Sequence, residues 1–563
     1  MKIREIQLHN YRSIQDETIG IGDYCLLIGA NNSGKTNVLD ALRTFYDLEK
    51  FDGSRDSPKF PTADRETWIE VEYELSDAEV GTIKAEYLRG AKRFRVRKWL
   101  HPPDKDKQGI FGYENGKLSG NLFYGWKNVA QGKLGDVIHV PAVSRLEEQT
   151  KLSGPSPLRD LINGILKPII ASSESFRKLE GAFEEFGQKI KDEETADNRS
   201  LAELERRINN EIERWGSTFS LEVVPPQQDE IVKNLIQHKI TDSDLKIPME
   251  SGSFGHGFQR HLIFTLIRVA SDYVEPKPEP KKKEFSPELR LLLFEEPEAY
   301  LHPPQQEILD RSLRTLAKMP GSQVIAATHS PLFVSRNTDD IANLIRLSKV
   351  GPKTQVGQAT RDKLNQLFEE NVAEMKLVNG AGGGNSAAEE DDMNPASALE
   401  ATRHFLWLNP DRCNMFFADL VVIVEGLSEQ VLTNYWVKTG QMKDPGRGVY
   451  VLESSGKFNI PRFMKLCTEM KIAHSVMYDE DRDKAGKKKE VHQKVADLIK
   501  QSQSSYTVKI ETIPTCLERY LGLDIEKKDR WKAAKLLLAA QRDQIDPAKL
   551  AEFKAKLESL LAL

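Results

Sequence analysis

The spacing of apolar and polar residues changes several times along the chain. Strict alternation at residues 68–75 and 93–99 predicts strands, and residues 1–100 are expected to be β-rich apart from one helix after residue 37. A buried strand is predicted at residues 137–140, ended by Pro141. Between Pro157 and Trp215 the spacing becomes helical, which predicts two long inserted helices with a polar turn near residues 192–198. Their apolar stripes are Leu158, Leu161, Ile162, Ile165 and Leu166, and then Leu201, Leu204, Ile208, Ile212 and Trp215.

Four later segments, at 291–294, 323–327, 420–424 and 473–478, are predicted to be strands that lead directly into polar residues, and those at 291–294 and 420–424 are apolar throughout. Short runs of this kind are typical of strands that a parallel sheet buries on both faces. A Pro/Lys-rich segment at residues 275–284 predicts an exposed loop, and a Gly-rich, acidic segment between residues 378 and 395 predicts a flexible linker. The pattern therefore predicts two α/β units joined by the second of these segments.

Composition narrows the class. The chain is 39% hydrophobic and 29% charged, as in soluble globular proteins, and its 563 residues are too many for one core. A net charge of -5 argues against a uniformly basic surface, so a nucleic-acid contact would depend on local patches. The four cysteines are scattered and suggest neither a zinc site nor a disulfide framework. Charged residues at the N-terminus and the lack of a long apolar run favour a cytoplasmic protein without a membrane segment.

The first candidate site is a phosphate-binding loop at residues 28–37. Gly29, Gly34, Lys35 and Thr36 fit Gly-x-x-x-x-Gly-Lys-Thr between an apolar run and a helical pattern, the strand–loop–helix context that such a loop requires. Its backbone N–H groups would surround phosphate oxygens, Lys35 would reach the outer phosphates and the Thr36 hydroxyl would hold Mg²⁺. The alternative is an ordinary glycine turn before a helix. Asn32 and Asn37 belong to the same candidate nucleotide site.

Three further groups follow in the order that a nucleotide hydrolase needs. Gly255, Gly257 and Gln259 lie in a glycine-rich segment ahead of an apolar helix, a second phosphate-binding arrangement. Glu295 and Glu296 follow a buried strand, where adjacent side chains point opposite ways, so that one can face a magnesium-bound water and the other the attacking water. His329 ends the next strand and could contact the terminal phosphate. Each group alone is more often structural, and it is the ordered set that indicates a nucleotide hydrolase.

This set resembles the ATP-binding-cassette ATPases of the SMC-like branch. The matching residues are 10–14, 255–260, 295–298, 301–303 and 328–330. The resemblance implies a dimer of heads that sandwiches ATP, with the glycine-rich signature serving the opposite protomer. It also implies that Glu296 is the hydrolytic base, that His329 senses the phosphate and that Arg12 lies near the nucleotide. Glu295 stands where Asp is common, and Gln149 is the candidate for the Q-loop glutamine.

The second candidate site follows the acidic linker. Glu425 ends the apolar run 420–424, Gly426 permits a turn, and Glu429 lies one helical turn further on. The run 473–478 leads into Asp479 and Asp481, which share a side in extended geometry. Acids at adjacent strand ends can converge on Mg²⁺ or Mn²⁺, and two such ions suit phosphodiester cleavage. A solvated charged loop is the alternative for residues 479–484 alone.

This pairing resembles the TOPRIM domain, and an SMC-like ATPase followed by TOPRIM resembles the OLD (overcoming lysogenization defect) family of ATP-dependent nucleases. Its relatives include the nuclease subunits of Gabija and of some retron phage-defence systems. The resemblance implies metal binding by the two glutamates and two aspartates above, with Asp483 as an adjacent candidate and Glu518 as a later acidic ligand. A family lysine near the scissile phosphate would be Lys532 or Lys535, a choice that the sequence leaves open. Candidate contacts to the DNA backbone, with a solvated run as the alternative, are Lys484, Lys487, Lys488 and Lys489.

The expected fold is α/β: an ABC-type ATPase head with an inserted helical dimerisation arm, then a parallel-sheet TOPRIM domain. The expected segments are an N-terminal lobe at 1–155, the arm at 156–216, a C-terminal lobe at 217–377, the linker at 378–399 and the TOPRIM domain with a C-terminal helical extension at 400–563. The resemblance implies ATP and Mg²⁺ (or Mn²⁺) as cofactors. Expected partners are DNA, a second copy as a dimer or dimer of dimers, and an accessory defence protein or nucleic-acid component in some systems.

The function expected is ATP-dependent, metal-dependent DNA cleavage in antiphage defence. The alternative is a nucleotide-switched DNA-binding or assembly protein with a non-catalytic TOPRIM domain. A topoisomerase would need a strand-passage domain with a nucleophilic tyrosine, for which little room follows residue 520. A primase commonly carries a zinc-binding module, which the cysteine spacing does not provide.

Overall fold

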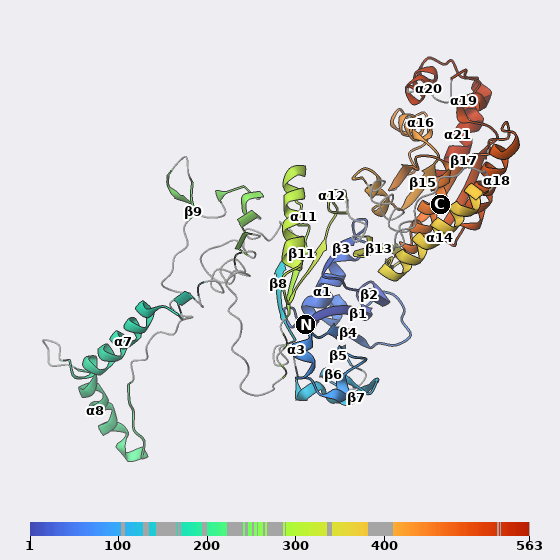
Figure 1. Ribbon diagram of the computed structural model, residues 1–563. Coiled ribbons are helices and arrows are strands. Elements are labelled where there is room, and N and C mark those ends of the chain that lie inside the picture. Colours follow the sequence, from blue (N-terminus) through green and yellow to red (C-terminus); the bar gives the residue numbers. More distant parts are fainter. Residues whose placement is uncertain are drawn as a thin grey trace. The chain divides into compact units, whose positions relative to one another are not determined.

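The computed structural model describes two compact units, residues 1–140 with 283–563 and residues 141–282 (Figure 1). None of the helices in the described ranges is long and apolar enough to cross a membrane. The residues described are 1–102, 107–127, 134–141, 166, 169–170, 172–193, 200–221, 240–242, 246–249, 253–255, 257–259, 261–262, 265–266, 269, 285, 287, 289–334, 341–380, 409–446, 448–525, 529 and 531–561.

An antiparallel sheet of six strands occupies the N-terminal part, in the order β2-β1-β4-β5-β6-β7. Its strands are β1 (Lys2–Tyr11), β2 (Ile14–Gly20), β4 (Thr67–Glu74), β5 (Arg93–His101), β6 (Gly109–Glu114) and β7 (Lys117–Leu122). The predicted strands at 68–75 and 93–99 are confirmed as β4 and β5. Alternation places Ile69, Val71 and Tyr73 in the core, while Glu70 and Glu72 on the other face pair with arginines of β5.

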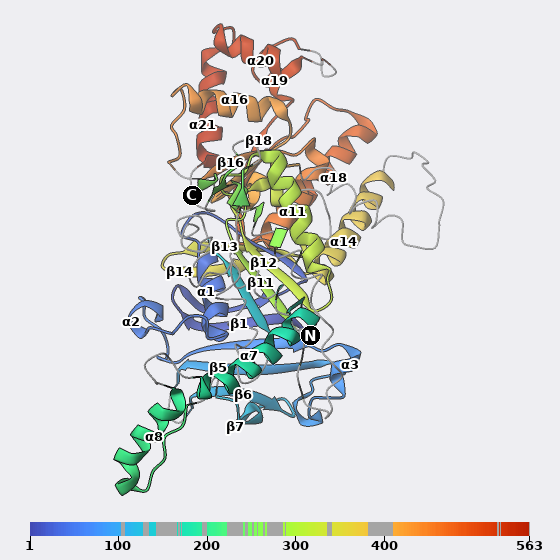
Figure 2. The same ribbon diagram turned by 90° about the vertical axis from the view of Figure 1, so that its left-hand side faces the viewer.

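A second sheet carries the phosphate loop, in the order β14-β13-β3-β12-β11-β8. All neighbours are parallel except the hairpin of β13 and β14. The strands are β3 (Tyr24–Ile28), β8 (Asp136–Val140), β11 (Arg290–Glu295), β12 (Ser322–Ala327), β13 (Leu344–Val350) and β14 (Lys353–Gly357). The helices of the residues that carry these two sheets are α1 (Lys35–Phe45), α2 (Gly53–Asp56), α3 (Asp77–Val80), α11 (Pro303–Ala317), α12 (Pro331–Val334) and α14 (Arg361–Gly380). Figure 2 shows α11 running beside β12.

The two sheets share one apolar core. It combines side chains of β1 and β4 with those of α1 and of β3, including Ile6, Val71, Leu39 and Leu27, all inaccessible to solvent. The central strands β3, β11 and β12 are buried almost throughout, as continuous apolar runs predict for parallel strands. The carboxyl ends of these strands therefore meet at one edge, where the phosphate loop lies.

The second unit contains α7 (Glu174–Asp192), α8 (Leu201–Ile212) and the short strands β9 (Ile240–Thr241) and β10 (Pro248–Met249). The predicted second helix is confirmed by α8 and the short 3₁₀ turn to Trp215. Helix α7 ends at Asp192, where the turn was predicted to begin. The first predicted stripe, apart from Leu166, lies outside the described residues, as does Gln149.

A four-stranded parallel sheet forms the C-terminal domain, in the order β16-β15-β17-β18. Its strands are β15 (Leu420–Val424), β16 (Val449–Glu453), β17 (Ala473–Asp479) and β18 (Thr507–Ile513). The helices are α16 (Leu427–Lys438), α17 (Ile460–Glu469), α18 (Gly486–Gln501), α19 (Leu517–Tyr520), α20 (Lys532–Gln541) and α21 (Pro547–Leu561). Trp436 and Phe553 pack together in its separate core. Of the predicted linker, residues 378–380 continue α14 and the rest lies outside the described residues.

The hairpin of β13 and β14 joins the phosphate-loop sheet to the C-terminal domain. Arg346 on β13 is 4% exposed, and its guanidinium donates to the carbonyls of Phe416, Ala418 and Lys471 at 3.1, 2.8 and 2.9 Å. Gly357 on β14 approaches the backbone of α17 so closely that a Cβ there would lie 2.2 Å from the Met470 carbonyl oxygen. The two domains therefore meet where the buried Arg346 guanidinium bonds to backbone carbonyls and where the lack of a Cβ at Gly357 allows a close backbone approach.

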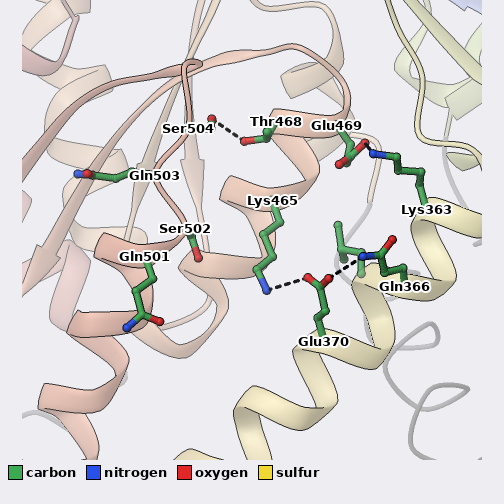
Figure 3. Close-up of a pocket in the computed structure, with 11 residues that line it drawn as sticks. Lys363, Gln366, Glu370, Lys465, Thr468, Glu469, Gln501, Ser502, Gln503 and Ser504 are labelled. Carbon is green, nitrogen blue, oxygen red and sulfur yellow. Dashed lines mark hydrogen bonds and ion pairs between the residues drawn. The ribbon is translucent and has the colours of Figure 1, made fainter.

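Helix α14 forms a second, polar contact with the same domain (Figure 3). Lys465 on α17 lies 2.7 Å from Glu374 and 3.6 Å from Glu370, and Lys363 lies 3.6 Å from Glu469. Lys363, Glu469, Lys465 and Glu370 line a pocket of about 260 Å³. The side chain of Lys363 is 58% exposed, so its pair contributes far less than the buried guanidinium of Arg346.

Candidate functional sites

The phosphate loop begins at the end of β3 and leads into α1. Lys35 is buried, and its Nζ donates to the carbonyls of Gly29 and Ala30 at 2.8 and 2.9 Å, across the mouth of the loop. Gly34 adopts a φ of 110° directly before α1, and a Cβ there would lie 2.5 Å from Oγ1 of Thr354. Thr36 and Asn32 are exposed on the same loop. A ring of loop amides, a lysine and a free helix start is an arrangement that binds phosphate groups.

Two contacts fix the back of this loop. Arg12 donates to Asp56 at 2.9 Å and to Asp40 on α1 at 2.5 Å, and it approaches Oδ1 of Asn37 at 3.4 Å. Its guanidinium therefore packs against the helix that follows the loop. Thr354 on β14 donates to the Ser33 carbonyl at 2.9 Å, so the hairpin that holds the C-terminal domain also touches the loop.

The two strand-end glutamates diverge, as predicted, although toward neighbouring strands and not toward opposite faces. Glu295 lies 3.7 Å from His139 at the end of β8, while Glu296, with a φ of 42°, lies 3.6 Å from Nε2 of His329. Burial and the charge of Lys35 lower the pKa of His329, and the Glu296 carboxylate opposes them. Burial lowers the pKa of Lys35 to about 8 against the opposing charges of Glu296 and Glu298. The lysine, the histidine and these acids thus form one electrostatic cluster.

Glu298 also belongs to this cluster, although its position in the sequence predicted no role for it. Its Oε1 accepts a hydrogen bond of 2.6 Å from the backbone N–H of His329, and burial raises the pKa of its carboxyl. The side chain therefore holds the histidine loop against the end of β11. The signal was present in Glu-Glu-Pro-Glu, but only the fold shows which glutamate turns inward.

The signature-like segment lies in the second unit. Gly255 accepts backbone hydrogen bonds from Phe258 and Gln259 at 3.0 and 3.2 Å, which starts a helical turn at Gly257. Gln259 is buried and donates to the Phe254 carbonyl at 2.7 Å. His256 and Arg260 lie outside the described residues.

In the C-terminal domain, the ends of β15 and β17 bring the predicted acids together. Oε2 of Glu425 accepts a hydrogen bond of 3.2 Å from the backbone N–H of Asp479. Glu429 sits in the first turn of α16, with its Oε2 3.2 Å from the Gly426 N–H. Glu518, from α19, is 1% exposed. Residues from three separate stretches of sequence therefore meet at the carboxyl edge of one parallel sheet, the usual position of a site in such folds.

The acids perturb one another strongly. Burial, followed by the charge of Glu425, raises the pKa of Glu429 to about 8. Burial, followed by the charges of Glu425, Glu429, Asp481 and Glu518, raises the pKa of Asp479 well above its usual range. Asp479 Oδ1 is buried and accepts no hydrogen bond from any described residue. Crowded carboxylates of this kind are costly unless a cation neutralises them.

Lysines supply part of that neutralisation. Lys532 lies 2.8 Å from Glu518, whereas Lys535 pairs with Asp529 at the surface, so of the two candidates only Lys532 reaches the cluster. Despite burial, the contact with Glu518 raises the pKa of Lys532. Lys484 lies 2.6 Å from Oδ1 of Asp481. Its ammonium group therefore contacts an acid, whereas a lysine that binds the DNA backbone would face the solvent.

Two more predicted residues lie apart from the cluster or beyond description. Asp483 pairs with Arg519 at the surface. Lys487 and Lys488 belong to the first turn of α18, and their side chains lie outside the described residues, whereas Lys489 is exposed on the same turn.

Two further residues at this edge were not predicted. His492 on α18 lies 2.9 Å from Oδ2 of Asp481, and Lys457, 1% exposed, donates to the Asp479 carbonyl at 2.6 Å. Both lie far in sequence from the acids they contact. A weak signal existed for Lys457, because it follows the end of the strand beside β15.

The donor set fits a divalent cation, because buried carboxylates from adjacent strand ends are the ligands that Mg²⁺ and Mn²⁺ prefer. Within the described ranges, however, no three Asp, Glu, His or Cys side chains are already arranged as a metal-binding group. Asp481 and Glu518 instead hold ion pairs with Lys484 and Lys532. Binding a cation would therefore require these side chains to turn from lysine toward the ion.

Two segments of the chain match known protein families. Residues 26–335, more than half of the chain, match the family described as "AAA domain, putative AbiEii toxin, Type IV TA system". Residues 416–481 match the family described as "Overcoming lysogenization defect protein-like, TOPRIM domain". The expected class, an ATPase head followed by a TOPRIM domain, is confirmed. The chain belongs to the OLD family, and these domains imply the use of a nucleotide and of divalent metal in general.

Named relatives agree with this assignment. The Old nuclease of Escherichia phage P2 is 25% identical over 389 residues, covering 66% of this chain and 63% of that protein. The endonuclease GajA of Bacillus cereus (strain VD045) is 22% identical over 518 residues, covering 87% of this chain and 76% of that protein. A solved SMC head bound to the C-terminal winged-helix domain of ScpA is 14% identical with a TM-score of 0.35, covering 65% of this chain and 100% of that chain. The chain thus spans less than two thirds of the phage P2 protein.

Proposed function

We propose that this protein is an ATP-hydrolysing, divalent-metal-dependent DNA endonuclease that acts in antiphage defence. The observation that carries the nuclease activity is the meeting of Glu425 and Asp479 at adjacent strand ends, with Glu429, Asp481 and Glu518 around them. A surface whose purpose is only to bind DNA would not concentrate buried carboxylates, since they repel phosphates. The names of the relatives, Old nuclease and endonuclease GajA, support the same activity.

In the ATPase head, we assign the nucleotide to the loop of residues 29–37. Lys35 would exchange the carbonyls of Gly29 and Ala30 for the outer phosphates, because it already points across the loop mouth. Thr36 and Glu295 would hold the magnesium of the nucleotide, and Glu296 would orient and deprotonate the attacking water. His329, held by Glu298, would contact the terminal phosphate.

The segment of Gly255, Gly257 and Gln259 would complete the nucleotide site of a second copy. This assignment makes the active head a dimer.

In the TOPRIM domain, Glu425, Glu429, Asp479, Asp481 and Glu518 would hold Mg²⁺ or Mn²⁺. Two such ions supply charge stabilisation to both the attacking and the leaving oxygen of a phosphodiester. Lys532 sits beside Glu518 with a raised pKa, so it stays protonated and can hold a scissile phosphate or donate a proton to the leaving oxygen. Asp483 pairs with Arg519 and Lys535 pairs with Asp529, both at the surface, and neither has an assigned role here.

A plasmid-cleavage assay tests this proposal. Wild-type protein with Mg²⁺ or Mn²⁺, with and without ATP, should nick or linearise the plasmid, and Asp479→Ala should lose at least about 100-fold in rate because a cation ligand is removed. Asp483→Ala, an exposed acid only four residues away, is the matched control and should cleave within about threefold of wild type. Lys35→Ala should lose ATP binding, measured by calorimetry.

Undiminished cutting by highly purified Asp479→Ala would contradict the nuclease assignment. A wild-type protein that binds DNA and ATP but never cuts would favour the nucleotide-switched DNA-binding alternative.

A further inference from the structure

Lys457 reaches the acidic cluster from the far side of the sheet. It follows β16, which borders β15 on the side away from β17, yet its Nζ donates to the carbonyl of Asp479 at the end of β17. The bond measures 2.6 Å, and the residue is only 1% exposed. The side chain therefore spans the end of β15, and it has no access to a substrate at the surface.

The same segment also holds the end of β15. The backbone N–H of Gly456 donates to the Glu425 carbonyl at 2.8 Å, and that of Ser454 donates to the Val424 carbonyl at 3.0 Å. Glu425 in turn accepts the Asp479 N–H through its carboxylate at 3.2 Å. The three residues are thus linked to one another by hydrogen bonds. The segment after β16 donates to the backbone carbonyl of Glu425, Lys457 donates to the backbone carbonyl of Asp479, and the Glu425 carboxylate accepts the Asp479 N–H.

Burying an ammonium group is expensive unless nearby groups compensate it. Here one carbonyl accepts its hydrogen bond, the Tyr478 ring lies 5.0 Å away, and the charges of Glu425, Asp479 and Asp481 act on it. A lysine held in this way connects the end of β16 to the end of β17 in a fixed geometry. Its counterparts Lys484 and Lys532 instead contact carboxylate oxygens directly.

We propose that Lys457 is a positioning residue that sets the separation of the Glu425 and Asp479 carboxylates and thereby the affinity for the divalent cation. This inference rests on the proposed metal-dependent function of the TOPRIM domain. Lys457 acts through the backbone carbonyl of Asp479, whereas Lys532 contacts the carboxylate of Glu518.

The substitution Lys457→Met separates positioning from mere charge compensation, because the two roles predict opposite signs. Methionine keeps most of the apolar length but removes the donor and the charge. If the charge alone mattered, removing a cation from a cation site would tighten Mn²⁺ binding. If Lys457 positions the acids, Mn²⁺ binding weakens, and we expect at least about a tenfold rise in the dissociation constant, the usual scale for a residue that orients a metal ligand.

The experiment measures Mn²⁺ binding to the full chain by calorimetry, and independently the rise in melting temperature that Mn²⁺ produces. Lys465→Met is the matched control, because Lys465 lies on the adjoining α17 but pairs with Glu374 and Glu370, and its Mn²⁺ affinity should equal that of wild type. Lys457→Gln restores a neutral donor one bond shorter than lysine, so it should recover part of the affinity. Its recovery also covers the case in which the methionine variant fails to fold.

Cleavage rates measured against Mn²⁺ concentration complete the test. We expect Lys457→Met to need about tenfold more Mn²⁺ for half-maximal rate while approaching the wild-type rate at saturation. Equal or tighter Mn²⁺ binding by Lys457→Met, or a glutamine variant no better than methionine, overturns the positioning role and leaves the nuclease proposal intact. A wild-type protein that neither binds Mn²⁺ nor cleaves DNA would overturn both.

Discussion

Replacing Arg346 by methionine should release the C-terminal domain from the phosphate-loop sheet. The guanidinium donates three hydrogen bonds of 2.8–3.1 Å to backbone carbonyls of the TOPRIM domain, and the residue is 4% exposed. Burial lowers the pKa of this arginine to about 10, so it remains charged at neutral pH. Methionine preserves the apolar stem and leaves the three carbonyls without this donor.

The magnitude follows from these contacts. A hydrogen bond from a charged donor contributes about 1.5–3 kcal/mol, so three would total roughly 4.5–9 kcal/mol if they were additive. Removing the guanidinium also removes the cost of burying it, which recovers a few kcal/mol. We therefore expect a net loss of about 3–5 kcal/mol of stability. For a domain of this size that corresponds to a fall of roughly 6–20 °C in melting temperature.

Differential scanning calorimetry of the full chain, with limited proteolysis of the junction, measures this loss. Lys363→Met is the matched control, because Lys363 also bridges the two domains but through an exposed contact of 3.6 Å with Glu469. That variant should stay within about 1 kcal/mol of wild type. If the melting temperature of Arg346→Met equalled that of Lys363→Met and lay within about 2 °C of wild type, the buried guanidinium would not be what holds the domains together.

Three further predictions concern the two sites. Lys532→Met should slow cleavage by about 100-fold or more while Lys535→Met stays near wild type, since only the former reaches the acidic cluster; equal rates in a plasmid assay would refute this choice. Glu429 has a pKa raised to about 8, so the folded protein binds a proton that the unfolded chain has lost, and stability in EDTA should fall by roughly 2–4 kcal/mol between pH 5 and 8. In urea unfolding at a series of pH values, the stability of Glu429→Gln should depend less steeply on pH than that of wild type. An unchanged pH dependence would assign the effect to another group. Lys35 has a pKa lowered to about 8, so ATP affinity should drop by up to about tenfold per pH unit above 8, whereas flat calorimetric affinities from pH 7 to 10 would contradict the assigned contact.

Local patterns predicted the elements well where one physical signal dominated. Continuous apolar runs became the buried parallel strands β3, β11 and β15, because a strand covered on both faces has no polar side to show. Strict alternation became β4 and β5, whose two faces meet an apolar core and a ladder of ion pairs. The linker boundary was wrong by three residues, since α14 continues to Gly380 although its last residues, Val378, Asn379 and Gly380, are weak helix formers.

The choice among chemically equal candidates lay beyond the sequence. Lys532 and Lys535 are one helical turn apart, and only packing of α20 shows that the first meets Glu518 while the second meets Asp529. Lys484 looked like a surface contact to DNA, but the turn after β17 folds it onto Asp481. The partner of Lys532 comes from another helix, whereas that of Lys484 lies three residues earlier, where only the fold of the turn brings the two side chains together.

The amino-acid sequence by itself determined the order of the two domains, the phosphate loop and the acids that end β15 and β17, because each is written in a short contiguous stretch whose backbone geometry is local. The tertiary structure alone decided which residues hold those stretches in place: Arg346 across the domain junction, Glu298 behind His329, and Lys457 beneath Asp479. Their partners come from strands adjacent in space and distant along the chain, and the energy of such contacts exists only once the sheets have formed.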